Sequence, residues 1–428
     1  MKKLLLITYY WPPSGGAGVF RWLKLVKYLE LIGWKCTIVT TKDGDYPAID
    51  NSLLAEIGHD TEIIRTKTPV FGKFLKKIMN RKEKIPYGSL KSSKNDSLFR
   101  KISLFVRINL IIPDVRKIWI KQAYKAAKFE IMTDNFDFVI TTGPPHSVHL
   151  VGLKLKNEFK INWVTDFRDP WSEIAYYNNV KRWKITKLAD KFYEKKVVTK
   201  CDIMLEAAPD ILAGFKKKKN VFTLMNAFDS ADFVNVKKRK SDKFIISHFG
   251  QLTVDSEIKI FQLIASKMVE DGFEDIRFDF YGNNDKKVIS DLQKEDNKNI
   301  FNFYGYFPHS EILQKIVDSS LLLLIIDTNR KDVITLKIFE YIGSKTPILG
   351  LAPLDSEPAK IINHSKSGKM IPWQNETDIV DFIKKTYKMW EIGEIGENRK
   401  KLISEYSWEN RAEKLDEILE NFESDWKS

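Results

Sequence analysis

Hydrophobic positions along the chain alternate between short continuous runs and longer segments with one apolar face. Short continuous runs are typical of strands that are buried on both sides of a sheet, whereas a period of about 3.6 residues predicts helices. Helices are predicted over Val115–Met132 and Thr186–Val198 in particular. The strands predicted in the first half of the chain are Lys3–Thr8, Lys35–Thr41, Glu62–Thr66, Phe138–Thr141, Asn162–Thr165 and Ile203–Glu206.

A second series of the same kind follows a polar, basic stretch from Ser230 to Asp242, which we interpret as a linker. A last helix with an apolar face is predicted over Trp408–Phe422. Alternating strands and helices indicate parallel sheets, so the predicted fold class is α/β with two doubly wound domains, 1–230 and 231–404. The strands predicted in the second series are Phe244–Phe249, Arg277–Tyr281, Phe301–Tyr304, Leu321–Ile326 and Pro347–Leu351.

Composition narrows the class of protein. With 428 residues, of which 43% are hydrophobic, the chain can bury two sizeable cores, and wholesale disorder is excluded. The longest apolar stretches fall short of the ~18–20 residues of a membrane-spanning helix. The apolar run at the N-terminus stops at Thr8, too early for a signal peptide, so we expect a cytoplasmic protein. Two cysteines in apolar runs and six scattered histidines argue against a disulfide or a metal site.

The net charge of +13 is concentrated in one segment. Between Phe71 and Pro113 the sequence has eleven Lys or Arg and two acids, interleaved with apolar residues. Such a basic amphipathic segment is suited to an anionic membrane surface. An insertion that packs on its own domain is the main alternative, and nucleic acid is the least favoured partner because no nucleic-acid motif is present. The predicted membrane contacts are Lys76, Lys77, Arg100 and Lys101.

A glycine-rich loop follows the first predicted strand, with the sequence Gly15-Gly16-Ala17-Gly18. Glycines let the backbone approach a ligand, and the helix that follows presents free N–H groups to an anion. The spacing differs from the pattern of dinucleotide-binding loops, and a flexible turn is the alternative. A nearby Asp43-Gly-Asp45 triplet could hold a magnesium ion, although a polar turn is the favoured interpretation.

Two further loops follow predicted strands in the first domain. His146 lies in the first of them and could bind a substrate hydroxyl or act as an acid or base, or could simply belong to the loop. The second loop has Arg168 between Asp166 and Asp169, a set that could bind hydroxyls or a phosphate. An internal ion pair that braces the loop is the alternative.

In the second domain, Lys337 and Glu340 lie three residues apart on a predicted helix that begins near Thr335. A lysine in the first turn adds to the attraction of the helix N-terminus for phosphate, and a carboxylate one turn later can accept both hydroxyls of a ribose. The alternative is a surface ion pair worth about 0.3–0.5 kcal/mol.

Four segments, in order along nearly the whole chain, resemble the GT-B glycosyltransferases of family 4, in particular a bacterial subgroup that builds surface polysaccharides. The resemblance implies two Rossmann-like domains that face a central cleft, a nucleotide-sugar donor on the C-terminal domain, an acceptor on the N-terminal domain, and a return of residues 405–428 to the N-terminal domain. These segments are Tyr9–Gly18, Asp166–Trp171, Asn226–Asp229, and Thr335–Tyr341 followed by Lys345-Thr-Pro-Ile.

The resemblance also assigns roles. Asp332 and Glu340 match the two acids of the family's E-x7-E motif, with Asp in place of the first Glu, and Glu340 would bind the donor ribose. His146 would be a histidine close to the reacting sugar, and it is predicted to be catalytic together with Asp166 and Arg168. The predicted donor-binding residues are Glu340, Lys337, Thr335, Asp332, Gly250, Gln251, Lys259, Gly15 and Gly16.

The function predicted on this basis is retaining transfer of a hexosyl or N-acetylhexosaminyl group from a nucleotide sugar to a lipid-linked or saccharide acceptor during bacterial surface-polysaccharide synthesis. Neither a metal nor a cofactor is expected, and the enzyme would lie on the inner face of the cell membrane. The alternatives are a nucleotide-sugar epimerase of similar fold and a non-catalytic protein that binds nucleotides or glycans.

Overall fold

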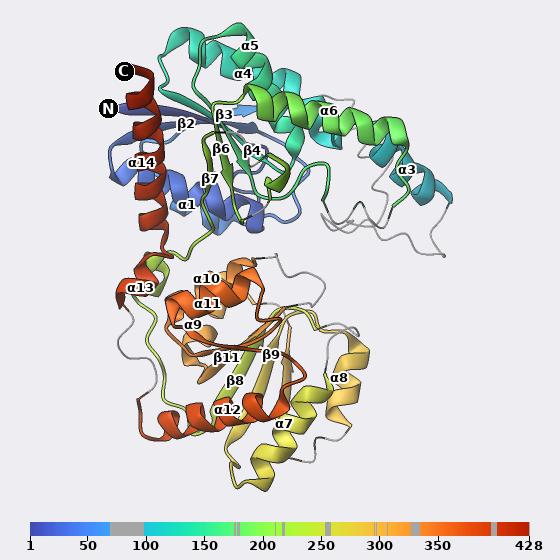
Figure 1. Cartoon of the computed structure of the whole chain (residues 1–428), viewed down its shortest axis with the longest axis vertical. Helices are drawn as coiled ribbons and strands as arrows, with labels where there is room; N and C mark the ends of the chain where they lie inside the picture. The colour runs from blue at the N-terminus through green and yellow to red at the C-terminus, as the bar shows by residue number, and fades with distance from the viewer. Residues whose placement is uncertain are drawn as a thin grey trace. The chain divides into compact units, whose positions relative to one another are not determined.

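The computed structural model describes residues 1–68, 98–174, 177, 180–209, 211–215, 219–252, 258–294, 296, 298–305, 307–326, 334–394 and 400–427. The chain divides into two compact units (Figure 1). Unit 1 contains Met1–Met225 and Ala412–Ser428, and unit 2 contains Asn226–Arg411. The boundaries predicted from the sequence were after residues 230 and 404.

Unit 1 is built on a parallel sheet of seven strands in the order β3-β2-β1-β4-β5-β6-β7. The central strand β1 pairs with β2 on one side and with β4 on the other, so that Leu4 lies between Cys36 and Phe138. All three residues are buried, which explains why these strands read as continuous apolar runs. The strands are β1 (Lys2–Ile7), β2 (Trp34–Thr41), β3 (Glu62–Thr66), β4 (Phe138–Gly143), β5 (Trp163–Phe167), β6 (Ile203–Glu206) and β7 (Val221–Thr223).

Helices cover both faces of this sheet. Along the sheet, the chain runs from β1 to β2 in one direction and from β3 back across to β6 in the other. Because crossovers between parallel strands are right-handed, α1 lies on one face of the sheet, and α4, α5 and α6 lie on the opposite face (Figure 1). The helices are α1 (Ala17–Leu31), α3 (Leu98–Asn109), α4 (Ile120–Thr133), α5 (His149–Glu158), α6 (Lys184–Lys200) and α14 (Trp408–Lys427), with short 3-10 turns η1 (Asn51–Glu56), η2 (Val115–Trp119), η3 (His146–Val148) and η5 (Ala213–Phe215).

Unit 2 is a parallel sheet of six strands in the order β10-β9-β8-β11-β12-β13. Its core is rich in aromatic side chains, among them Phe244, Phe261 and Phe278, all fully buried. The strands are β8 (Phe244–Phe249), β9 (Ile276–Tyr281), β10 (Phe301–Tyr304), β11 (Leu321–Ile325), β12 (Ile348–Leu351) and β13 (Gly368–Ile371). The helices are η6 (Ser230–Phe233), α7 (Lys259–Glu270), α8 (Lys286–Gln293), α9 (His309–Asp318), α10 (Leu336–Ser344), α11 (Glu357–Ser365), α12 (Glu376–Glu391) and α13 (Lys400–Ser404).

The eleven predicted strands are all present, with ends that shift by two residues at most. Two strands at sheet edges, β7 and β13, were not predicted. The predicted helix Val115–Met132 is wrong in its first turn, because residues 115–119 form the 3-10 turn η2 before α4 begins. The interpretation of Ser230–Asp242 as a linker also needs correction. Lys238 Nζ donates to the carbonyl oxygen of Ser319 at 2.9 Å, and this stretch therefore packs on unit 2.

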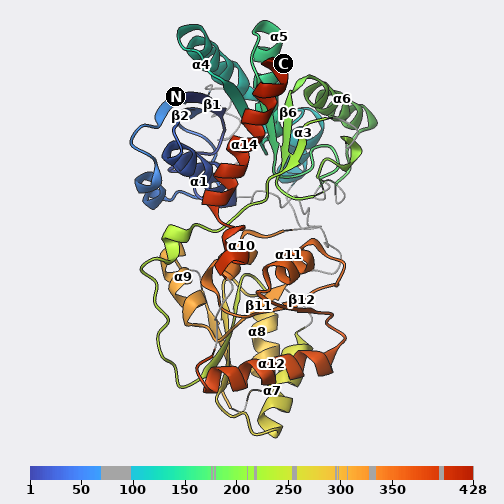
Figure 2. The same cartoon turned by 60° about the vertical axis from the view of Figure 1, so that its left-hand side comes forward.

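The C-terminal helix α14 packs on unit 1 from Ala412 onward (Figure 2). Leu415 and Leu419 are fully buried, and Asp416 accepts hydrogen bonds from Trp34 Nε1 at 2.9 Å and from Lys2 Nζ at 2.7 Å. These contacts make the last helix part of the first sheet's packing. None of the helices in the described part of the chain is both long and apolar enough to cross a membrane.

Candidate functional site

The candidate site in unit 2 lies at the carboxyl ends of β8 and β11, where the loop after β8 meets the start of α10. Gly250 follows β8, and its φ of 155° is in the region that favours glycine. Lys337, in the first turn of α10, places its ammonium group against the Gly250 backbone, and a Cβ at position 250 would overlap Nζ. A residue with a side chain at 250 would therefore displace the lysine.

The ammonium group of Lys337 has an unusual pKa for a lysine. Burial lowers the pKa of its ammonium group to about 8, although nearby Glu340 acts in the opposite direction. His248, near the end of β8, is also buried, and burial together with the charge of Lys337 lowers its pKa to about 3. The imidazole is therefore neutral at pH 7, and its Nδ1 lies 3.1 Å from the carbonyl oxygen of Leu323. Lys337 is thus a partly desolvated cation next to a neutral histidine.

The start of α10 has polar groups without hydrogen-bond partners among the described residues. Thr335 is the N-cap residue, but its side chain makes no capping hydrogen bond, and its Oγ1 is buried without a partner among the described residues. The first N–H groups of a helix have no partner within the helix and carry a partial positive charge. Uncapped N–H groups, a buried hydroxyl and a lysine ammonium group together form a suitable environment for a phosphate.

Glu340 lies one helical turn after Lys337, and its carboxylate pairs with His309. Its Oε1 is 2.9 Å from Nε2 of His309, the first residue of α9, and both side chains are partly exposed. The surface ion pair between Lys337 and Glu340 that the sequence left open does not form. Glu340 instead keeps a carboxylate oxygen and exposed surface with which it can accept hydroxyl groups.

Aromatic rings line the neighbouring strand ends. Phe249, Tyr281 and Tyr304 are the last residues of β8, β9 and β10. The rings of Phe249 and Tyr281 stack with centroids 4.7 Å apart, and those of Tyr281 and Tyr304 with centroids 4.8 Å apart. The hydroxyl of Tyr341, on α10, accepts a hydrogen bond from the Phe249 backbone at 3.1 Å. The edge of the sheet is thereby fixed to the helix that carries Lys337 and Glu340.

The other predicted donor-binding residues of unit 2 have different positions. Gln251 follows Gly250 and is exposed, and Lys259 is the exposed first residue of α7. Asp332 lies outside the described residues. The structure therefore brings Gly250, Lys337, Thr335 and Glu340 close together. Among the described residues, Gln251 and Lys259 make no hydrogen bond or ion pair with this group.

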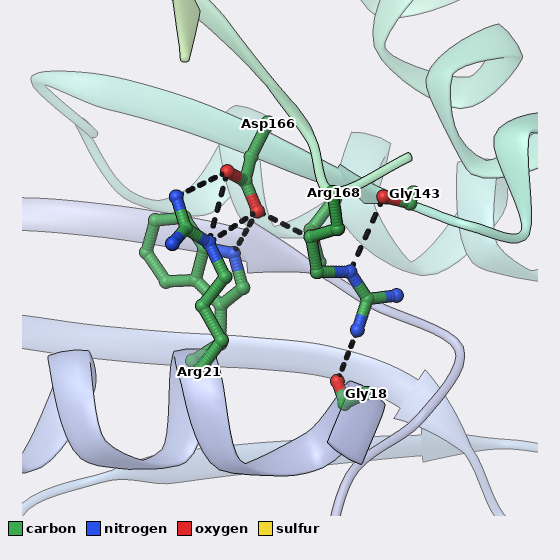
Figure 3. Close-up of polar contacts among 7 residues, drawn as sticks. Gly18, Arg21, Gly143, Asp166 and Arg168 are labelled. Carbon is green, nitrogen blue, oxygen red and sulfur yellow. Dashed lines mark hydrogen bonds and ion pairs between the residues drawn. The ribbon is translucent and has the colours of Figure 1, made fainter. Parts of the chain in front are cut away.

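In unit 1, Asp166 is completely buried at the end of β5 (Figure 3). Its carboxylate forms a two-point ion pair with Arg21 of α1, with Nη2 2.8 Å and Nε 3.1 Å from Oδ1. Trp22 Nε1 and Thr142 Oγ1 each donate to Oδ2 at 2.7 Å. The sequence left open an ion pair within this loop, between Arg168 and the acids beside it, but Asp166 pairs with Arg21 of α1 instead. In this state Asp166 has no surface to offer to a substrate.

Arg168 clamps three loops at the same edge (Figure 3). Its guanidinium group donates to the carbonyl oxygens of Gly18, Gly143 and Pro144, with Nε 3.2 Å from Gly143. A Cβ at Gly18 would lie 2.8 Å from Arg168 Nη1, so this close approach needs glycine at the start of α1. The partly exposed Arg168 fixes the glycine-rich loop relative to the loops after β4 and β5.

His146 belongs to a buried aromatic cluster in the loop after β4. Its ring is parallel to that of Trp171 at a centroid distance of 5.2 Å, and the ring of His149 stacks at 5.9 Å. Burial, the neighbouring His149 and the charge of Arg168 lower the pKa of His146 well below its usual range. The pKa of His149 is lowered to about 3, mainly by burial, and its Nδ1 lies 2.9 Å from Thr141 Oγ1. Both imidazoles are neutral at pH 7.

The remaining candidates of unit 1 are placed as follows. Gly15 is buried, with its N–H bonded to the carbonyl oxygen of Ala48 at 2.9 Å, and Gly16 is the exposed N-cap of α1. Asp43 accepts a hydrogen bond from the Thr68 backbone at 2.8 Å. No group of three or more His, Cys, Asp or Glu that could hold a metal occurs in the part of the chain that the structure describes.

The structure describes only some of the predicted membrane contacts. Lys76 and Lys77 lie outside the described residues. Arg100 and Lys101 belong to α3, whose backbone is described but whose side chains at these positions are not.

Sequence reasoning missed Arg21, His149, His248 and His309. Two of these had a signal. His149 follows His146 by one helical turn, and His309 comes just after a predicted strand, where binding residues often lie. Arg21 had none, because an arginine among the apolar residues of a helix is normally placed on its exposed side.

Comparison by sequence gives no relatives: no model of a protein family matches the chain, and no curated protein matches it. Solved structures do match over nearly its whole length. A sucrose-phosphate synthase from Thermosynechococcus elongatus has a TM-score of 0.63 at 12% identity, covering 99% of this chain and 100% of that one. A mutant of S. aureus TarM, in complex with fondaparinux, α-GlcNAc-glycerol and UDP, has a TM-score of 0.58 at 15% identity, covering 98% of this chain and 100% of that one.

A third similar structure belongs to a different class of enzyme by its description. It is a putative UDP-N-acetylglucosamine 2-epimerase from Listeria monocytogenes, with a TM-score of 0.53 at 14% identity, covering 99% of this chain and 98% of that one. At such identities the likeness concerns the fold alone. The predicted α/β fold class is confirmed: two Rossmann-like domains with parallel sheets, as in the GT-B glycosyltransferases.

Proposed function

We propose that this protein is a retaining glycosyltransferase of family 4 that moves a hexosyl or N-acetylhexosaminyl group from a nucleotide sugar to a lipid-linked or saccharide acceptor in bacterial surface-polysaccharide synthesis. The observation that carries the proposal is the group at the start of α10. There the desolvated ammonium of Lys337 lies against the Gly250 backbone, and Glu340 follows one helical turn later.

The chemistry of a nucleotide-sugar donor suits this group. When the bond between the sugar and the phosphate breaks, negative charge accumulates on the departing diphosphate. A fixed cation and helix N–H groups that are already oriented stabilise that charge without reorganisation. Lys337, the start of α10 and the Gly250 backbone would perform this role. A metal ion or other cofactor has no required part in the proposed mechanism.

Glu340 would hold the nucleoside. A carboxylate can accept hydrogen bonds from both hydroxyls of a ribose, and His309 Nε2, 2.9 Å from Oε1, would keep the carboxylate oriented. The UDP in the TarM complex supports a nucleoside diphosphate as the ligand class. The stacked rings of Phe249, Tyr281 and Tyr304 make the adjoining strand ends rigid, which suits a preformed binding site.

In unit 1 the proposal keeps His146, Asp166 and Arg168 in supporting roles near the acceptor. Arg168 positions the glycine-rich loop with Gly15 and Gly16, and Asp166 fixes α1 through Arg21. His146, neutral and nearly buried, can donate or accept one hydrogen bond to a sugar hydroxyl. The basic segment 71–113, with Lys76, Lys77, Arg100 and Lys101, would contact the inner face of the membrane.

One observation favours a second function. The putative epimerase from Listeria monocytogenes has a similar fold, and an epimerase also binds a nucleoside diphosphate. The epimerase would act on the nucleotide sugar with no acceptor, whereas a transferase needs one.

The test is release of nucleoside diphosphate from a panel of nucleotide sugars, with and without a lipid extract of bacterial membranes. Release that depends on the extract supports the transferase. Release without any acceptor supports the epimerase, and donor binding without turnover on any acceptor supports a binding protein. Nuclear magnetic resonance of the product then tests retention, because an inverted anomeric carbon contradicts that part of the proposal.

A further inference from the structure

Helix α6 has an exposed apolar row that no part of the candidate site uses. Ile185, Leu188 and Phe192 are 72%, 67% and 54% exposed, and Trp183, at the N-cap, is 49% exposed. With about 100° of rotation per residue, the first three lie within an arc of about 60° on the helix. Large apolar side chains that form one patch, rather than being scattered, indicate a surface that contacts a membrane, a protein or a ligand.

The charged residues of α6 differ in burial according to their sign. Its two acids, Asp190 and Glu194, are buried on the inner side, where Asp190 accepts from Trp171 Nε1 at 3.0 Å and pairs with Arg182. Glu194 accepts from the Ser172 backbone at 3.4 Å. All lysines of the helix are exposed: Lys184, Lys187, Lys191, Lys195, Lys196 and Lys200.

Two contacts show how the lysines lie relative to the apolar row. Lys196 Nζ is 4.3 Å from the centre of the Phe192 ring. Lys191 Nζ is 3.8 Å from Glu173, and both side chains are more than half exposed. An exposed pair of this kind is weak, at about 0–1 kcal/mol, and leaves the outer face of α6 strongly cationic.

Helix α3 extends the same surface. The ring of Phe105 meets that of Trp183 edge to face at 5.0 Å, and Asn109 bonds to the backbone of Trp183 and the hydroxyl of Thr186 at 2.7 and 3.0 Å. Phe105 and Leu110 are also exposed. Figure 1 shows α3 next to the N-terminal end of α6. The apolar row therefore adjoins the end of the basic segment 71–113.

We propose that the outer face of α6, together with Phe105 and Leu110 of the α3 region, is the surface with which this protein lies on an anionic lipid bilayer. Apolar side chains in the middle of a cationic face match the boundary between acyl chains and headgroups, and the lysines match anionic headgroups. A nucleic acid or an acidic protein could pair with the lysines, but its charged surface would not bury Ile185 and Leu188. The inference rests on the proposed function only in giving a lipid-linked acceptor as the reason for membrane contact.

The first test is co-sedimentation with vesicles of phosphatidylcholine, with and without phosphatidylglycerol. Replacing the apolar row in the triple variant Ile185→Ser, Leu188→Ser, Phe192→Ser should weaken partitioning about tenfold or more. The variant Lys184→Gln, Lys191→Gln, Lys195→Gln should lose most of the preference for phosphatidylglycerol. These side chains are exposed, so circular dichroism should show that both variants stay folded.

The matched control removes exposed apolar side chains from the opposite face of unit 1. Leu31 and Ile32, at the end of α1, are 73% and 42% exposed. The variant Leu31→Ser, Ile32→Ser should bind vesicles like the unmodified protein. The proposal is overturned if the unmodified protein does not bind the anionic vesicles, or if the triple serine variant binds them equally well. Equal binding to soluble heparin by both proteins, with no vesicle preference, would instead identify a general polyanion site.

A second readout locates the contact directly. Cys36 and Cys201 are buried, so a polarity-sensitive fluorophore can be attached selectively to a cysteine introduced by Leu188→Cys. Its emission should shift to the blue when anionic vesicles are added, whereas the same label at Glu417→Cys, on α14, should show no shift. No shift at position 188 overturns the proposal. UDP binding by the same proteins, measured by thermal shift without lipid, tests the proposed function separately.

Discussion

At the scale of single residues, the charge of Lys337 gives the sharpest test of the proposed donor site. Burial lowers the pKa of its ammonium group to about 8, compared with about 10.4 for an unperturbed lysine. Only the charged form attracts a phosphate. UDP affinity should therefore be highest below about pH 8 and fall as the pH rises through that value, as measured by calorimetry. In Lys337→Met the UDP affinity should be about tenfold lower at pH 7. It should also no longer fall as the pH rises through about 8.

The control for this prediction is Lys385→Met, an exposed lysine on α12 of the same unit. Its UDP affinity and the pH dependence should match those of the unmodified protein. If Lys337→Met keeps the same fall in affinity near pH 8, another group causes it and Lys337 does not bind the diphosphate.

Glu340 should affect a different part of the ligand. In the proposed site its carboxylate contacts the ribose, while Lys337 contacts the diphosphate. Glu340→Ala should therefore weaken UDP binding about tenfold and leave the binding of inorganic diphosphate unchanged, because the lost charged hydrogen bonds involve only the sugar. Lys337→Met should weaken both. Calorimetry with the two ligands separates the roles, and an equal loss of both ligands in Glu340→Ala would contradict the ribose assignment.

At the scale of secondary-structure elements, the buried ion pair of Asp166 and Arg21 joins β5 to α1. A buried charge that loses its partner is costly, at about 3–5 kcal/mol. Asp166→Asn and Arg21→Met should each lower the free energy of unfolding of unit 1 by that amount, as followed by urea denaturation. Trp22 and Thr142 also donate to Asp166, so removing the acid leaves further polar groups unsatisfied.

The double variant Arg21→Met, Asp166→Asn provides the matched comparison. Because the two residues act as one pair, its loss of stability should be clearly smaller than the sum of the two single losses. Strict additivity would mean that the ion pair is not what joins these elements. An unchanged stability of Asp166→Asn, accompanied by lost transfer activity, would restore a catalytic role for this residue.

The same pair shows where prediction from the sequence ends. The position of Asp166 after a strand follows from local apolar pattern, but its partner is 145 residues away, and no local pattern specifies that contact. The central strands were predicted well because their apolar runs are continuous. The edge strand β7 has three partly exposed residues, and β13 begins with Gly-Lys, so neither has a distinct pattern. The candidate residues of α10 were predicted individually, whereas the partner His309 depends on the packing of α9 against α10.

At the scale of the whole molecule, neither the distribution of charge over the surface nor the path of the chain follows from the apolar pattern alone. The sequence places most of the net charge between residues 71 and 113, and it predicts one basic segment. The sequence does not show that α6 adds a second cationic face. Asp190 and Glu194 lower the formal net charge of the helix, but both are buried and so leave its exposed surface cationic. Two α/β series were evident from alternation. The return of the last helix to unit 1 was implied by the resemblance to a known family and not by local pattern, because it depends on contacts between distant parts of the chain.

The return of α14 to unit 1 leads to a prediction about which unit it stabilises. Leu419 is fully buried there, and replacing it with Ala creates a cavity that costs about 2–5 kcal/mol. Hydrogen exchange followed by mass spectrometry should then show faster exchange in β1 and β2, while the strands of unit 2 keep their protection. Ile383→Ala, a buried residue of α12 in the core of unit 2, is the matched control and should give the reverse pattern. Faster exchange in both units for either variant would mean that the two units unfold as one cooperative body, so that the last helix serves the stability of the whole chain.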